Sequence, residues 1–211
     1  MTTQRPAAQA PWSGREIAIF AKVPQPGAVK TRLIPSLGAE GAATLHAQLI
    51  RRTLATAGAV AKAATCLWLG GAVDTYAVPV GQRWELQRGA DLGARMHHAF
   101  LVTLARSRAC VLVGTDCPAL QPSHLQRAFT ELEEHDVVVV PAEDGGYVLI
   151  ALKAPQPQLF EDIEWGGPTV MEATRARIEA TGLRAAYLPA LPDLDTPADL
   201  ERAREAGWLA S

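Results

Sequence analysis

Residues 17–33 read I-A-I-F-A-K-V-P-Q-P-G-A-V-K-T-R-L, an apolar run followed by a loop of prolines, glycine and cations. The run over Ile17–Ala21 predicts a buried strand, and the apolar spacing over 39–59 predicts a helix. A loop that joins a strand to a helix at the carboxyl end of a sheet tends to bind ligands in α/β proteins. Cations and free backbone N–H groups in such a loop suit phosphate. Three cations lie within the loop: Lys22, Lys30 and Arg32. The stretch therefore predicts an α/β fold and a phosphorylated ligand, with a nucleotide as the leading candidate.

Another interpretation of this loop stays open, because lysine and arginine on a surface loop are often simply solvated. The loop is neither a Walker A motif nor G-x-G-x-x-G, so no common nucleotide fingerprint decides between the two interpretations.

Strand and helix patterns alternate along the rest of the chain. We expect strands at 65–69, 84–87, 110–114, 137–140 and 184–188, and helices at 92–106, 122–135, 169–181 and 197–206. The segment 147–152 is expected to return antiparallel after a turn at 143–146. This pattern predicts a three-layer α/β/α sandwich around a mostly parallel mixed sheet.

The composition describes one ordinary globular domain, over 15–211, after an N-terminal tail at 1–14 that we expect to be disordered. A net charge of −2 among 211 residues argues against nucleic acid as a partner. No apolar stretch approaches the roughly 18 residues of a membrane span. Three scattered cysteines (Cys66, Cys110, Cys117) do not make a disulfide framework, so we expect a cytoplasmic protein.

Asp116 follows the apolar run 110–114 in V-L-V-G-T-D-C-P. An aspartate just past the end of a central strand projects into the crevice above the sheet. There it can hold a divalent cation against the phosphates of a ligand, because magnesium takes one or two carboxylates together with phosphate oxygens. The alternative is a turn or capping aspartate before the helix at 122–135.

Asp195 lies in L-P-D-L-D-T-P-A-D-L, where Asp195 or Thr196 is expected to cap a helix that begins at Pro197. Capping is the simpler interpretation of Asp195. Together with Asp116, however, Asp195 becomes a candidate second metal ligand, as metal-assisted phosphate chemistry requires. The five histidines do not cluster, so oxygen ligands and hence Mg²⁺ or Mn²⁺ are favoured over zinc.

Four further positions carry alternatives. Asp144, in the turn E-D-G-G, either completes a tight turn or faces the crevice and handles the acceptor. Asp91 is the expected N-cap of the helix at 92–106, in a loop that could also contact a nucleotide base. Trp165 stacks on a ring or fills the core, and we favour the core. Cys117, beside Asp116, is expected to be a small buried thiol rather than a nucleophile.

Five blocks together resemble the GT-A-type nucleotide-diphospho-sugar transferase superfamily, and most of all its "rSAM/selenodomain-associated transferase 1" family. The blocks are K-V-P-Q-P-G-A-V-K-T-R-L, A-D-L-G-A-R-M, G-T-D-C-P-A-L, D-G-G-Y-V-L-I and D-L-D-T-P-A-D-L, which span roughly residues 15 to 207. The resemblance is weaker to the guanylyltransferases for 2-phospholactate and the molybdenum cofactor. It implies nucleotide contacts at Lys22, Gly27, Lys30 and Arg32, and metal binding at Asp116 and Asp195.

The resemblance implies a metal-dependent transferase that uses a nucleotide sugar or a nucleoside triphosphate, with an unknown small-molecule acceptor. Nucleotidyltransferases usually begin with L-A-G-G-x-S-x-R-M-G, and this chain has A-K-V-P-Q-P-G-A-V-K-T-R-L instead. We therefore favour glycosyl transfer, with nucleotidyl transfer that releases pyrophosphate as the alternative. A non-catalytic nucleotide-binding protein is a third interpretation, of a different class.

Overall fold

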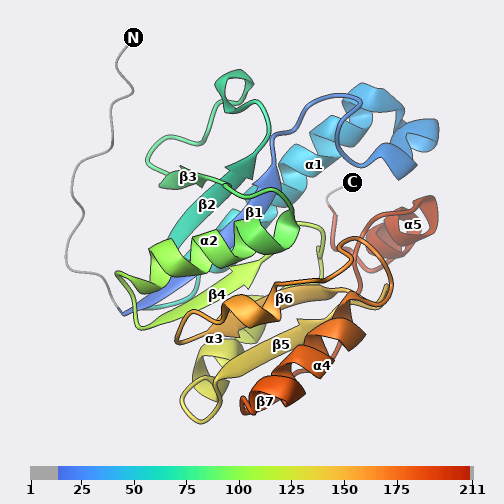
Figure 1. Ribbon diagram of the computed structural model, residues 1–211. Helices are drawn as coiled ribbons and strands as arrows, with labels where there is room; N and C mark the ends of the chain where they lie inside the picture. The colour runs from blue at the N-terminus through green and yellow to red at the C-terminus, as the bar shows by residue number, and fades with distance from the viewer. Residues whose placement is uncertain (1–13, 210–211) are drawn as a thin grey trace.

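Seven strands form one mixed sheet in the computed structural model, which describes residues 14–209 (Figure 1). The strands are β1 (Arg15–Lys22), β2 (Ala64–Gly70), β3 (Trp84–Leu86), β4 (Ala109–Val113), β5 (Val137–Pro141), β6 (Tyr147–Leu152) and β7 (Ala185–Tyr187). Their order across the sheet is β3-β2-β1-β4-β6-β5-β7. Only β6 is antiparallel to its neighbours, β4 and β5. The predicted mostly parallel sheet with one antiparallel strand is confirmed.

Helices cover both faces of the sheet and make the predicted three layers. They are α1 (Ile34–Gly58), α2 (Leu92–Leu104), α3 (Pro122–Glu131), α4 (Val170–Thr181) and α5 (Pro197–Glu205), with short 3₁₀ turns at 31–33, 73–75 and 157–159. The side chains of α1 and α3 join one buried apolar cluster, and those of α2 and α4 join another on the opposite face. Figure 1 shows α2 and α4 in front of the sheet. The α/β/α sandwich is therefore confirmed.

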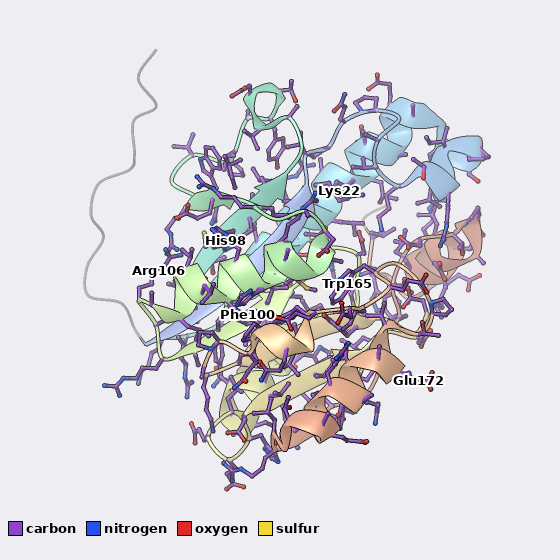
Figure 2. All side chains as sticks on the ribbon, viewed as in Figure 1. Lys22, His98, Phe100, Arg106, Trp165 and Glu172 are labelled. Atoms are coloured by element: carbon purple, nitrogen blue, oxygen red, sulfur yellow. The ribbon has the colours of Figure 1, made fainter. Side chains whose placement is uncertain are left out.

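The central strands are apolar because helices cover both of their faces. In β1, Ile17 and Ile19 face the cluster of α1 and α3, while Ala18 and Phe20 face that of α2 and α4. Figure 2 shows Phe100 on the side of α2 that faces the sheet.

The strand order places a crevice at the carboxyl ends of β1 and β4. The connection from β1 to β2 runs through α1 on one face, whereas the connection from β3 to β4 runs through α2 on the other. Ligands of open α/β sheets bind outside the strand ends where the connections diverge in this way. The loop after β1 and the loop after β4, which carry the predicted site residues, both open into this crevice.

Element boundaries differ little from those expected. The helix expected at 39–59 begins at Ile34, and Gly38, with φ 70° and ψ 167°, kinks it after its first turn. The helix expected at 122–135 ends at Glu131. The expected tail lies outside the described residues, except for Gly14, whose carbonyl accepts hydrogen bonds from the N–H groups of Arg108 and Ala109. Gly14 thus belongs to the folded domain.

The opposite end of the sheet holds a buried carboxylate. The side chain of Glu16 is fully buried and lies 2.8 Å from the Arg83 guanidinium and 2.9 Å from that of Arg106. Burial raises the pKa of Glu16 to about 7, although Arg83 acts in the opposite direction. Figure 2 shows Arg106 at the end of the sheet opposite to Lys22, so this cluster is remote from the crevice.

Candidate active site

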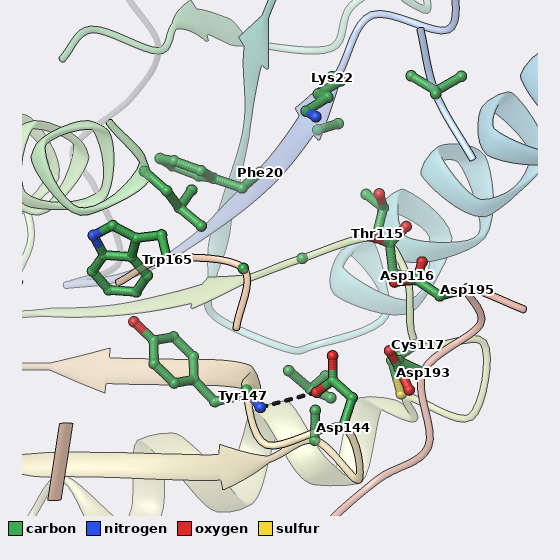
Figure 3. A pocket seen from close by; sticks show the side chains of 18 of the residues that line it. Phe20, Lys22, Thr115, Asp116, Cys117, Asp144, Tyr147, Trp165, Asp193 and Asp195 are labelled. Carbon is green, nitrogen blue, oxygen red and sulfur yellow. Dashed lines mark hydrogen bonds between the residues drawn. The ribbon is translucent and has the colours of Figure 1, made fainter. Parts of the chain in front are cut away.

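A cavity of about 660 Å³ opens at the carboxyl ends of β1 and β4. Its walls include the loop after β1, the start of α2, the loop after β4, the turn between β5 and β6, the segment before α4, and the segment before α5. Figure 3 shows aromatic side chains on one side of this cavity and carboxylates on the other. Most of the residues predicted from the sequence to form a site meet here.

Lys30 bridges the two predicted metal ligands. Its Nζ lies 2.6 Å from Asp116 Oδ1 and 2.9 Å from Asp195 Oδ1, and it donates a hydrogen bond to the backbone oxygen of Leu194 at 2.5 Å. The Lys30 side chain is only 3% exposed. Burial acts to lower the pKa of Lys30, but Asp116 and Asp195 outweigh it and raise the pKa above its ordinary value. The ammonium group is therefore charged, and it was expected at the phosphates rather than between carboxylates.

The backbone holds Asp116 beside the C-terminal segment. The N–H of Leu194 donates to the carbonyl of Asp116 at 2.8 Å. This bond places Asp193 and Asp195, on either side of Leu194, next to the loop after β4. Asp116 and Asp195, 79 residues apart in sequence, thus converge on one cation, as the sequence predicted for a metal.

The start of α5 explains why Asp195 is available to the site. Thr196 caps the helix, since its side chain accepts a hydrogen bond from the N–H of Asp199, and Asp199 Oδ2 accepts bonds from the N–H groups of Thr196 and Asp195. The capping that the sequence assigned to Asp195 or Thr196 is done by Thr196. The carboxylate of Asp195 is left to face the cavity.

Three carboxylates form a compact acidic cluster, which we define as Asp144, Asp193 and Asp195. One oxygen of each lies within 4.8 Å of the others. Burial, together with the charges of Asp144 and Asp195, raises the pKa of Asp193 to about 6. Asp144 also closes its own turn by accepting the N–H of Gly146 at 2.9 Å, and it lines the cavity as well. Oxygen-only donors at this spacing fit Mg²⁺ or Mn²⁺.

Arg202 forms ion pairs with two carboxylates that flank the acidic cluster. Its guanidinium lies 2.8 Å from Glu143 Oε2 and 3.1 Å from Asp199 Oδ1. It therefore connects α5 to the turn that carries Asp144. Asp193 and Arg202 were not among the predicted site residues. The alternation of Asp193 and Asp195 in an extended segment could have indicated the first, because residues i and i+2 share a face there.

The remaining predicted nucleotide contacts lie at different distances from the cavity. Lys22 and Arg32 are exposed and line it, and Arg32 Nη1 is 3.9 Å from Asp195 Oδ2. Gly27 turns the loop with φ 80° but does not line the cavity. Asp91 is the N-cap of α2, as expected, accepting the N–H of Ala94 at 2.8 Å, and it also lies outside the lining.

Trp165 packs against the apolar cluster of α2 and α4, as the favoured interpretation expected, and it also faces the cavity. It is half-buried, lines the cavity, and lies edge-on to Tyr147 with ring centroids 6.4 Å apart. Its contact with α2 depends on Gly93, where an added Cβ would lie 2.6 Å from Trp165 Nε1. Gly145 lets the segment that carries Trp165 pack closely against the turn between β5 and β6, because a Cβ added at Gly145 would lie 2.0 Å from the Pro168 carbonyl oxygen. Trp165 and Tyr147 thus form an aromatic wall of the cavity that the sequence did not reveal.

Cys117 is a buried thiol, as expected, and burial raises its pKa to about 12. His46 lines the cavity behind Lys22, and its Nε2 lies 3.0 Å from the Lys22 carbonyl oxygen. Burial lowers the pKa of His46, so its ring is neutral near pH 7.

The chain is similar to a protein family and to solved structures. The profile of a family described as uncharacterized proteins conserved in bacteria, DUF2064, matches residues 42–167. A crystal structure from Desulfovibrio desulfuricans G20, a candidate nucleotide-diphospho-sugar transferase, is 30% identical over 94% of this chain and 89% of its own, with a TM-score of 0.86. No curated protein sequence matches the chain.

Two more distant structures share the fold. CMP:2-keto-3-deoxy-manno-octonic acid synthetase complexed with CTP is 13% identical, over 92% of this chain and 98% of its own, with a TM-score of 0.61. Rv0371c from Mycobacterium tuberculosis H37Rv, in complex with manganese, is 17% identical, over 91% and 99%, with a TM-score of 0.57. Within residues 14–209, none of the helices has the length and apolarity needed to cross a membrane.

Proposed function

Because this chain belongs to the DUF2064 family and to the nucleotide-diphospho-sugar transferases, we propose that it transfers a glycosyl group from a nucleotide sugar to a hydroxyl acceptor. The observation that carries the proposal is the convergence of Asp116 and Asp195 on one cation at the mouth of the loop after β1. A diphosphate between that loop and these carboxylates needs a divalent cation to offset its charge.

The carboxylates of Asp116 and Asp195, with Asp193 beside them, are the proposed ligands of Mg²⁺ or Mn²⁺. Bound there, the metal would neutralise charge on the leaving diphosphate. Rv0371c, which shares the fold, was crystallised in complex with manganese, and this is in keeping with the proposed metal. Lys22, Lys30 and Arg32 are the proposed phosphate contacts. When the metal and the nucleotide sugar bind, the Lys30 ammonium must move from the two carboxylates to the phosphates.

In the proposed reaction, the acceptor oxygen forms a bond to the anomeric carbon as the bond from that carbon to the phosphate oxygen breaks. The leaving nucleoside diphosphate takes the electron pair. Asp144, exposed at the edge of the acidic cluster, is the proposed group that orients the acceptor hydroxyl and takes its proton. Most of the catalysis then comes from positioning and charge.

The loop sequence supports glycosyl over nucleotidyl transfer, because the glycine-rich nucleotidyltransferase loop is replaced by a proline-rich one. Thermal unfolding against nucleoside triphosphates and nucleotide sugars, each with and without Mn²⁺, tests the proposal. A ligand at 100 times its dissociation constant adds about 2.7 kcal/mol, or about 5–10 °C in Tm for this chain length. We expect a metal-dependent shift with nucleotide sugars that Asp116→Ala abolishes. Pyrophosphate release from a triphosphate would show nucleotidyl transfer instead.

A further inference from the structure

The cavity is divided by charge between its two sides. The lysines and arginines that line it are Lys22, Lys30, Arg32 and Arg95, which come from the end of β1, from the segment between β1 and α1, or from α2. The described lining residues between 142 and 170 include no lysine or arginine, although Trp165 among them packs against Gly93 of α2. This part of the lining, the acceptor wall, consists of Ala142, Asp144, Gly146, Tyr147, Val148, Trp165, Gly166, Gly167 and Val170.

The acceptor wall combines a flat aromatic surface with carboxylates. Trp165 stands half-exposed beside Tyr147, and Phe20 and Met96 continue the apolar surface behind them. Figure 3 shows Trp165, Tyr147 and Phe20 grouped on one side of the cavity, with Asp144 at their edge. Tyr147 directs its hydroxyl to the sulfur of Met96 at 3.7 Å rather than to the acidic cluster.

The aromatic surface is held in place by backbone contacts. Gly93 and Gly145 have no room for a side chain against Trp165 and Pro168, and the N–H of Met171 donates to the Gly145 carbonyl at 2.8 Å. Trp165 is therefore fixed before any ligand binds, which lowers the entropy lost when a ring stacks on it.

From this division we propose that the acceptor is an uncharged, ring-containing alcohol, and not a phosphorylated compound. Its ring stacks on Trp165, as flat apolar faces do on indole. Its hydroxyl then reaches Asp144 and the acidic cluster. A phosphate in the same place would face Asp144 and Asp193. No cation lies on the acceptor wall itself, and Arg95, on the neighbouring α2, donates a hydrogen bond from its Nε to the Gly89 carbonyl at 3.2 Å. This inference rests on the proposed function, and it names the class of acceptor that the same site takes.

Saturation-transfer NMR on the protein with Mg²⁺ and the nucleoside diphosphate bound tests the inference. The probes are methyl β-D-glucopyranoside and benzyl alcohol, each with its phosphorylated counterpart, glucose 1-phosphate and benzyl phosphate. We expect signals from at least one neutral probe, a loss of at least tenfold in its affinity in Trp165→Ala, and retention in Trp165→Phe. Trp84→Phe, in the edge strand β3, is the control and is expected to change nothing.

A second variant tests the charge argument in the opposite direction. Gly167 lines the cavity with a negative φ, and an added Cβ meets no atom closer than 3.6 Å, so Gly167→Lys is tolerated. It is expected to improve the affinity for the phosphorylated probe at least tenfold relative to the neutral one.

The inference is overturned if the phosphorylated probes bind the unmodified protein more tightly than the neutral ones, or if Trp165→Ala leaves ring binding unchanged. Nucleotide binding measured on the same samples separates the two proposals. Neutral-ring binding without any metal-dependent nucleotide binding contradicts the proposed function and leaves the aromatic subsite standing. Nucleotide binding with a preference for phosphorylated probes contradicts the inference alone.

Discussion

Replacing Lys30 by methionine removes the only charge that lies directly between Asp116 and Asp195 in the described part of the chain. Breaking a buried ion pair costs about 3–5 kcal/mol, because a charge is left without compensation. Here the carboxylates are 50% and 38% exposed, so water reduces the cost, and we expect about 2 kcal/mol. For about 200 residues, that corresponds to a loss of about 4–8 °C in Tm.

The same substitution should increase the response to metal. Once the ammonium is gone, a divalent cation no longer competes with it for Asp116 and Asp195. Thermal unfolding in a Mn²⁺ titration is therefore expected to show a larger Tm increase for Lys30→Met than for the unmodified protein. At saturating metal most of the loss is restored.

Lys62→Met is the matched control. Lys30 and Lys62 both have positive φ, 47° and 59°, so the backbone strain of the substitution is similar, while Lys62 is exposed and absent from the cavity lining. We expect Lys62→Met to change Tm by less than about 2 °C and to leave the response to Mn²⁺ unaltered. An equal Mn²⁺ response in Lys30→Met and the unmodified protein would refute the proposal that Asp116 and Asp195 bind a divalent cation in competition with Lys30.

Four further predictions concern the stability of the fold and the reactivity of its thiols. Glu16→Gln leaves Arg83 and Arg106 without their buried carboxylate and should cost about 3 kcal/mol, measured by urea unfolding; a loss below about 1 kcal/mol would contradict this. Gly145→Ala should lower Tm much more than Gly166→Ala, because both glycines have φ near 90° but only Gly145 meets the Pro168 carbonyl; equal losses would show that strain alone decides. Burial raises the pKa of Cys66 and Cys117 to about 12, so at pH 8 both thiols should react with a disulfide reagent at least tenfold more slowly in the native than in the denatured protein. Since their native pKa exceeds the unfolded value of about 9, the stabilisation from these thiols is complete below pH 9 and is lost as the pH rises toward 12, which a pH series of Tm values checks.

The elements of the fold could be predicted because their signals are local. Buried strands such as β4 read as unbroken apolar runs, and the start of α5 carries its own capping residues, Thr196 and Asp199. The meeting of Asp116 and Asp195 could also be predicted, since residues that follow strands of one sheet share an edge.

Other parts of the site depend on contacts that no local pattern carries. Lys30 binds Asp195, which lies 165 residues later in the chain. The local sequence around Lys30 therefore does not tell whether its ammonium group contacts a phosphate or a carboxylate. Trp165 belongs to the cavity because Gly93, 72 residues earlier, leaves room for its indole. A glycine that admits a distant side chain resembles any other glycine near a helix start, and for that reason the sequence did not show that Trp165 also faces the cavity.

The arrangement of charges also bears on where the proposed divalent cation would bind. The described ion pairs join Lys30 to Asp116 and Asp195, and Arg202 to Glu143 and Asp199, at two edges of the acidic cluster. Within the described residues, no ion pair reaches Asp144 or Asp193, although Asp193 is half-buried and its pKa is raised by burial and its neighbours. At the half-buried position of Asp193, stability alone would favour a neutral side chain, because an unpaired carboxylate that is partly removed from water destabilises the fold. Carboxylates held together at such a cost are what a site for a divalent cation requires, and the larger Mn²⁺ response expected of Lys30→Met is the direct measure of that requirement.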